Sequence, residues 1–240
     1  MDESDDHGKV CYKSMETTDK KMKLIEPILQ GVRCAEHTLQ LAVHDVLKEK
    51  QMKTSLEKVR LAVKTFRKLP FKKLFTLSKR TKPKLDCPTR CNSTYLMVQS
   101  LLKEKEFILS LTEEEEQNVI DDELWEFLNK FERSFKFVAE ATVKLQDPQI
   151  TFGVFYLIWE KCAFQLKKIN YALSIVVAEK MKQRRQILMN NKAYLAAIFV
   201  DQRINFRNSP FITNDQRDLA LVNILIYVSF LSEIMLYVRY

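Results

Sequence analysis

Apolar side chains recur at intervals of three or four residues along most of the chain, which is the spacing of one buried side of a helix. The clearest run lies at residues 56–66, and similar runs occur in residues 34–47, 92–108, 121–145 and 151–188. The pattern predicts a mainly α-helical fold with at most one or two short strands near the N-terminus, the first at residues 25–33. The residues expected to be buried in the first four of these helices are Cys34, Thr38, Leu41, Ala42, Leu47, Leu56, Val59, Val63, Phe66, Leu96, Val98, Leu101, Leu102, Ile108, Leu124, Trp125, Leu128, Phe131, Phe135, Val138 and Val143.

Local residue types predict where helices begin and end. Pro70 should end the second helix, and residues 78–91, which contain two prolines and a basic cluster, should form a loop. Asn92 or Ser93 is a candidate N-cap, because a side-chain oxygen can accept hydrogen bonds from the free amides of a first turn. A further break is expected near Asn170.

Composition excludes several classes of protein. Only three glycines occur in 240 residues, and loops that cradle phosphates need glycine for close backbone approach, so a nucleotide-binding loop is not expected. The five cysteines are scattered and odd in number, which favours a reducing compartment over a disulfide framework. The first residues are acidic and lack the basic and apolar regions of a signal peptide, so an intracellular protein is expected.

Positive charge is concentrated in one segment. Residues 48–84 contain fourteen Lys or Arg and two acidic residues, a net charge of +12, whereas the whole chain carries +8. A segment this basic is typical of a phosphate-binding surface, although a solvated helix face is an equal alternative. The candidate nucleic-acid-binding residues, which include two from the flanking motifs, are His37, Arg60, Lys64, Arg67, Lys68, Lys72, Lys73, Lys79, Arg80, Lys82, Lys84 and Arg90.

Two motifs flank the basic segment. The first is Cys34-Ala-Glu-His37, and the second is Leu85-Asp-Cys-Pro-Thr-Arg-Cys-Asn-Ser-Thr-Tyr-Leu-Met97. Together they resemble the transposases of the hAT family of DNA transposons, in which the Cys-x-x-His is followed by Arg-Trp in a PTRWNSTYLML context. Residues 150–159 and 195–204 resemble two later motifs of that family, in the same order and at similar spacing.

The resemblance implies the helical insertion domain of an RNase H-like transposase. In that family two Asp and one Glu hold divalent metal ions that stabilise the attacking and leaving oxygens of a phosphodiester. The resemblance places both Asp before the Cys-x-x-His and the Glu after the helical insertion. Asp19 follows no apolar strand, and Glu233 stands alone in an apolar stretch, so neither is expected to be a ligand. The chain is therefore expected to be a truncated, catalytically inactive fragment without a cofactor.

The motif residues leave several roles open. Structural zinc sites need four ligands, so Cys34 and His37, even with His44 two helical turns further on, are not expected to hold zinc. The resemblance implies that His37 lies near the scissile phosphate, whereas this chain by itself favours a buried Cys34 and a locally hydrogen-bonded His37. The family's Trp after Arg90, implicated in stacking on a flipped base, is Cys91 here. A cysteine offers no stacking surface, while Arg90 is a candidate for a phosphate contact or an ion pair.

Three regions are expected along the chain: an acidic and polar lead-in at residues 1–25, a transposase-like helical domain at residues 26–218, and an apolar helix at residues 219–240. The last region is long enough to span a bilayer. Its polar positions, with Glu233 among them, favour a packed helix over a membrane anchor.

These observations lead to two hypotheses about function. The first is a transposon-derived protein of the nucleus that binds DNA weakly and non-specifically through residues 48–84. The second is a helical interaction module that associates with itself or with a full-length transposase through aromatic-rich stripes at residues 124–138 and 152–164. Ordinary core packing is the simpler explanation of those stripes.

Overall fold

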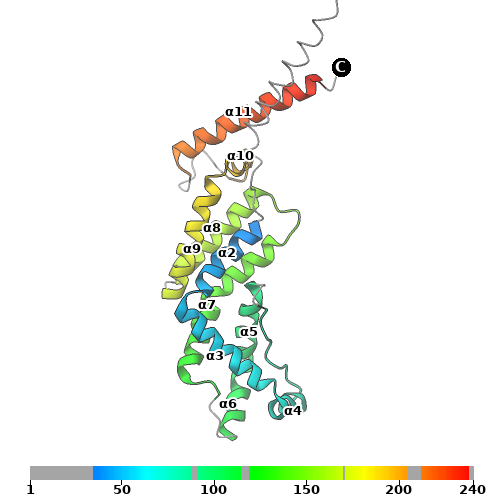
Figure 1. Cartoon of the computed structure of the whole chain (residues 1–240), viewed down its shortest axis with the longest axis vertical. Helices are drawn as coiled ribbons and strands as arrows, with labels where there is room; N and C mark the ends of the chain where they lie inside the picture. The colour runs from blue at the N-terminus through cyan, green and yellow to red at the C-terminus, as the bar shows by residue number, and fades with distance from the viewer. Residues whose placement is uncertain (1–34, 88–90, 115–118, 170, 205–211, 238–240) are drawn as a thin grey trace, which may run out of the picture. The chain divides into compact units, whose positions relative to one another are not determined.

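The computed structural model describes residues 35–87, 91–114, 119–169, 171–204 and 212–237. Within these ranges every regular element is an α-helix, so the predicted mainly helical fold is confirmed (Figure 1). The strand expected at residues 25–33 lies outside the described residues. The chain divides into two compact units, one of residues 34–186 and one that includes residues 187–240. The helices of the first unit are α2 (Ala35–Leu47), α3 (Lys50–Phe66), α4 (Leu69–Leu77), α5 (Cys91–Lys103), α6 (Lys105–Glu114), α7 (Asp122–Leu145), α8 (Phe152–Ile169) and α9 (Ala172–Met189), the last of which crosses the boundary.

Helix α7 is the centre of the first unit, where it packs on α2, α3, α5 and α8 (Figure 1). Its first turn is capped by Asp121, whose carboxylate accepts a hydrogen bond from the Leu124 amide at 2.7 Å. Phe131 and Phe135 are buried and stacked, with ring centroids 4.2 Å apart. The buried apolar side chains of residues 121–145 therefore form the core of this unit.

Several predicted details of burial are wrong. Leu96 is 41% exposed and Val143 is 59% exposed, because each falls outside the arc of its helix that meets a neighbour. Leu41 and Leu47 are only half-buried. Thr38 and Ala42 of α2 are buried as predicted, but the other buried positions of this helix are Leu39, Val43 and Val46.

The predicted helix ends are correct in part. Helix α3 ends at Phe66, but Pro70 lies in the first turn of α4, where its missing N–H costs no intrahelical hydrogen bond. Helix α5 begins at Cys91, so Asn92 and Ser93 lie inside its first turn and are not N-caps. The break expected near Asn170 is confirmed, since α8 ends at Ile169 and α9 begins at Ala172.

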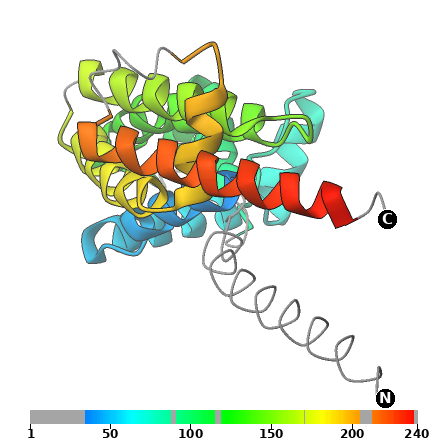
Figure 2. The ribbon, with the colours of Figure 1, turned by 90° about the horizontal axis from the view of Figure 1, so that it is seen from above.

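The second unit contains α10 (Lys192–Val200) and α11 (Asn214–Tyr237), which cross and pack on each other (Figure 2). Ala220 and Asn223 of α11 are buried, whereas Leu225 is 67% exposed. Helix α11 runs across the boundary expected between residues 218 and 219. In the part of the chain that the structure describes, no helix has both the length and the apolar character of a membrane span.

Candidate nucleic-acid interface

The first element of the basic segment is α3. The side chains that were predicted to be its core, Leu56, Val59, Val63 and Phe66, are all buried. Lys50, Lys53 and Lys64 follow one another at helical spacing on the side away from this core and are exposed. Because the apolar side of α3 packs into the core, the ammonium groups of these lysines face solvent, where they can contact the phosphate backbone of a nucleic acid.

The second element is α4, a short helix held by aromatic side chains. The rings of Phe66 and Phe71 meet edge to face at 5.3 Å, and those of Phe75 and Phe107 at 5.0 Å. Lys72 and Lys73 remain exposed near the start of α4, which has no acidic residue in its first turn. Free amides and cations together make this helix end electropositive.

The end of α4 carries an unusual backbone conformation. Lys79 has a φ of 52°, in the left-handed region that favours glycine. The Arg80 amide donates to the Phe75 carbonyl at 2.9 Å, and the Lys79 amide donates to the Thr76 carbonyl at 3.1 Å. These two bonds form a Schellman motif with a lysine at the position where glycine is usual, and the ammonium group stays exposed.

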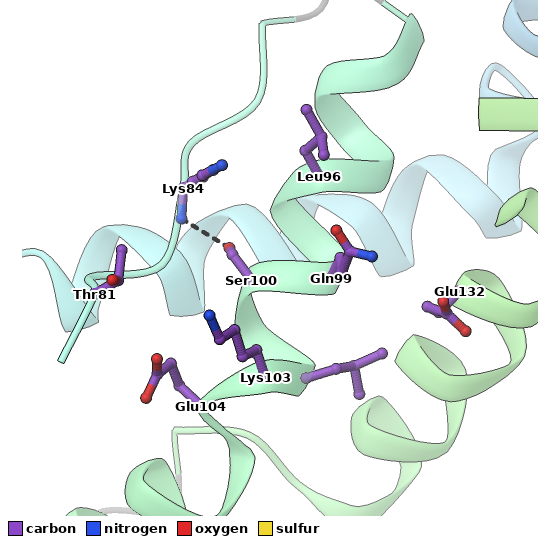
Figure 3. Close-up of a pocket in the computed structure, with 9 residues that line it drawn as sticks. Thr81, Lys84, Leu96, Gln99, Ser100, Lys103, Glu104 and Glu132 are labelled. Atoms are coloured by element: carbon purple, nitrogen blue, oxygen red, sulfur yellow. Dashed lines mark hydrogen bonds between the residues drawn. The ribbon is translucent and has the colours of Figure 1, made fainter. Parts of the chain in front are cut away.

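The third element is an extended segment of residues 80–87, which we call the strap. It is hydrogen-bonded to side chains of both α3 and α5. Arg67 is the C-cap residue of α3, and its Nη1 donates to the Pro83 carbonyl at 2.9 Å. On the other side, the Lys84 amide donates to Ser100 Oγ at 2.8 Å (Figure 3). The strap is therefore a fixed part of the first unit.

The strongest attachment of the strap is an ion pair. Arg60 Nε lies 3.1 and 3.0 Å from the two carboxylate oxygens of Asp86, and Arg60 Nη2 lies 2.7 Å from Asp86 Oδ2. Thr94 Oγ1 donates to the same carboxylate at 3.2 Å, and only 4% of the Asp86 side chain is exposed. The hydrogen bond to Asp86 raises the pKa of the Arg60 guanidinium above its ordinary value.

The third arginine of the segment is also bonded to the protein. Arg80 Nη1 lies 3.1 Å from Glu104 Oε2, and its guanidinium carbon lies 4.9 Å from the centre of the Phe107 ring. All three arginines of residues 48–84 are thus internal anchors. The lysines are different: among the described residues no ion pair is found for Lys64, Lys68, Lys72, Lys73, Lys79, Lys82 or Lys84, of which all but the half-buried Lys82 are exposed.

An open hollow of about 720 Å³ lies between the strap, α5 and α7 (Figure 3). Its acids are already engaged, because Glu104 pairs with Arg80 and Glu132 accepts a hydrogen bond from the Tyr95 hydroxyl at 3.1 Å. Lys84 and Lys103 are the cations on its wall. Lys103 was not among the predicted site residues, because it lies outside the basic segment; its place in the last turn of a helix was the available signal.

The structure describes only part of the two motifs. His37 is exposed in the first turn of α2, an element separate from α3, α4 and the strap. Cys34, Arg90 and the Cys91 side chain lie outside the described residues. Within the described ranges no group of three or more His, Cys, Asp or Glu side chains could hold a metal ion.

Residues 32–133 match a family model described as the ZBED1 RNase-like helical domain. The match includes the Cys34–His37 motif, the whole basic segment and the strap, and it ends within α7. A comparison with curated proteins finds no match. The family-model match supports a transposase-derived helical domain of the hAT or ZBED type, in agreement with the resemblance seen in the motifs. The later motifs at residues 150–159 and 195–204 lie beyond the matched residues.

Proposed function

We propose that this chain is a nuclear, transposase-derived protein that binds DNA non-specifically through the lysines of residues 48–84. The observation that carries the proposal is the division between arginines and lysines in this segment. The arginines are bonded within the protein, and the lysines are left without acidic partners in the described residues. An ammonium group in that state gains by replacing the condensed counterions of a phosphate backbone.

The chemistry of this surface fits non-specific binding of DNA better than recognition of a particular base sequence. Lysine is a point charge on a flexible stem, whereas the planar guanidinium group of arginine bonds a guanine edge through two nitrogens in a fixed geometry. The planar guanidinium groups of Arg60 and Arg80 are committed to Asp86 and Glu104. The surface can therefore contact phosphates and has little means to distinguish bases.

The test is the salt dependence of binding to a labelled DNA duplex of arbitrary sequence. If about five lysines contact phosphates, the logarithm of the binding constant falls with the logarithm of salt concentration with a slope of about −4 to −5. Changing Lys72→Gln and Lys73→Gln together should make the slope less steep by about 2. Lys144→Gln, which removes an exposed lysine in the last turn of α7, is the matched control and should leave the slope unchanged. Absent or salt-insensitive binding contradicts the proposal.

We also propose that the chain has no catalytic activity of its own. The proposal is supported by the resemblance, which puts the metal-binding Asp and Glu of the family outside the helical insertion, and by the match to a helical domain. Incubation of the pure protein with Mg²⁺ or Mn²⁺ and a transposon-end duplex should produce no nicks. Nicking that is lost on Asp19→Ala would contradict it.

Self-association is the second candidate function, and α11 favours it. The aromatic stripes in α7 and α8 are largely buried within the chain, with Trp125, Phe131 and Trp159 each at most 3% exposed. Apolar side chains of α11 are instead exposed at helical spacing: Leu221, Leu225 and Val228. A monomer that elutes at 28.4 kDa over a wide concentration range would exclude this candidate.

A further inference from the structure

The strap has no secondary structure of its own, so its position depends on side chains from the helices beside it. Arg60 and Arg67 hold it from the side of α3, and Ser93, Thr94 and Ser100 hold it from the side of α5. Cys87 bonds to Ser93 through both its amide, at 2.9 Å, and its carbonyl, at 2.6 Å. Without these contacts an extended segment of this length would sample many conformations.

Asp86 bonds to both Arg60 and Thr94, and it is also the least expected residue in the strap. It is the sole acidic residue between Glu57 and Glu104 in the sequence. A carboxylate inside a phosphate-binding surface opposes DNA by charge alone. Its almost complete burial and its bidentate bond to Arg60 point to a different purpose.

We propose that the Arg60–Asp86 pair is a positioning device, which fixes the strap so that Lys82 and Lys84 are in place before DNA arrives. The inference rests on the proposed DNA-binding function and assigns Arg60 and Asp86 to positioning and not to phosphate contact. A lysine on a fixed segment has less conformational freedom to lose on binding than one on a free loop, so fixing the strap increases affinity.

Charge and positioning make opposite predictions for the removal of Asp86. Asp86→Asn removes a negative charge from the basic surface, so electrostatics alone predicts tighter binding of DNA. Positioning predicts weaker binding, because the amide cannot replace the bidentate, charge-assisted bond to Arg60. Glu57→Gln is the matched control, since Glu57 is exposed on α3, is close enough to raise the Arg60 pKa, and makes no hydrogen bond or ion pair with the strap among the described residues.

The experiment measures the affinity of the full chain for a labelled duplex of arbitrary sequence at one low salt concentration. Glu57→Gln should bind about twofold more tightly than the unaltered protein. Asp86→Asn should bind about threefold or more weakly. The amides of Lys84 and Cys87, which bond to Ser100 and Ser93, should exchange hydrogen faster in Asp86→Asn.

A double variant keeps the test valid if Asp86→Asn affects folding. Arg60→Gln combined with Asp86→Asn removes the ion pair and leaves the net charge unchanged, and it too should bind about threefold or more weakly. The inference is overturned if Asp86→Asn binds as tightly as Glu57→Gln, or if the double variant binds like the unaltered protein. A lack of salt-dependent binding by the unaltered protein overturns the proposed function itself, and this is seen before any substitution is made.

Discussion

Two arginine–carboxylate pairs of the first unit differ in how their surroundings shift the pKa values of their side chains. Arg60 and Asp86 join α3 to the strap, and the hydrogen bond between them favours the charged form of Arg60. Arg185 and Glu160 join α9 to α8, with Arg185 Nε 2.5 Å from Glu160 Oε1. There, burial raises the pKa of Glu160 in spite of the neighbouring cation. In the second pair, burial of the Glu160 carboxylate therefore outweighs the attraction of the Arg185 guanidinium, as expected where lost hydration is incompletely compensated.

The two pairs also differ in their further hydrogen bonds, one of which comes from the Thr94 hydroxyl. The Asp86 carboxylate accepts from both nitrogens of the Arg60 fork and from Thr94. Arg185 also donates to the Tyr156 hydroxyl at 3.3 Å and lies 5.8 Å from the centre of the Tyr156 ring, so its charge is shared among several contacts. We therefore expect the first pair to matter more for folding than the second.

The largest effect is expected when the pair at the strap is broken. Asp86→Ala leaves the half-buried Arg60 without its carboxylate and frees the end of the strap, so the free energy of unfolding should fall by about 2–3 kcal/mol. Chemical denaturation followed by circular dichroism measures this change. A loss no larger than that of an exposed surface substitution would mean that the pair does not hold the strap.

A smaller effect, of opposite sign, is expected at the end of α4. Lys79→Gly relieves the left-handed backbone at a φ of 52° and should raise the free energy of unfolding by about 1 kcal/mol. The same change removes an exposed ammonium group and should make the salt slope of DNA binding less steep by about 1. Thr76→Gly, one turn earlier inside the helix, is the control and should destabilise the protein.

Substitution in the Arg185–Glu160 pair should change the free energy of unfolding least at neutral pH. Glu160→Gln should change the free energy of unfolding by less than about 1 kcal/mol, because the ion pair is offset by the cost of burying the charge. A large destabilisation, comparable to that of Asp86→Ala, would abolish the contrast between the two pairs.

The pH dependence of stability gives a second test of the difference between the two ion pairs. The folded protein holds the Glu160 proton more tightly than the unfolded chain, so the contribution of this group is greatest below its ordinary pKa and is lost as the pH rises through the raised value. Glu160→Gln should therefore gain stability relative to the unaltered protein as the pH rises from acid toward neutral. Denaturation curves at a series of pH values test this, and a difference that stays constant with pH would contradict it.

The helical pattern was predictable because it depends on neighbours within one turn. The spacing of Leu56, Val59, Val63 and Phe66 correctly predicts the buried side of α3, and the interruption at Asn170 correctly separates α8 from α9. Predictions failed where burial depends on which neighbour a helix meets. Leu96 has the right spacing for the core of α5 but lies exposed, since α7 covers a different arc.

The sequence by itself determined the helical class, the location of the positive charge and the resemblance to a transposase, because composition and motif order can be read along the chain. It did not determine which cations are available. The partner of Arg60 lies 26 residues away and that of Arg80 lies 24 residues away, so only the folded chain brings them together. The tertiary structure decided that these arginines are anchors and that Lys103 joins Lys84 at the hollow, since ion pairing depends on distance in space and not on distance in sequence.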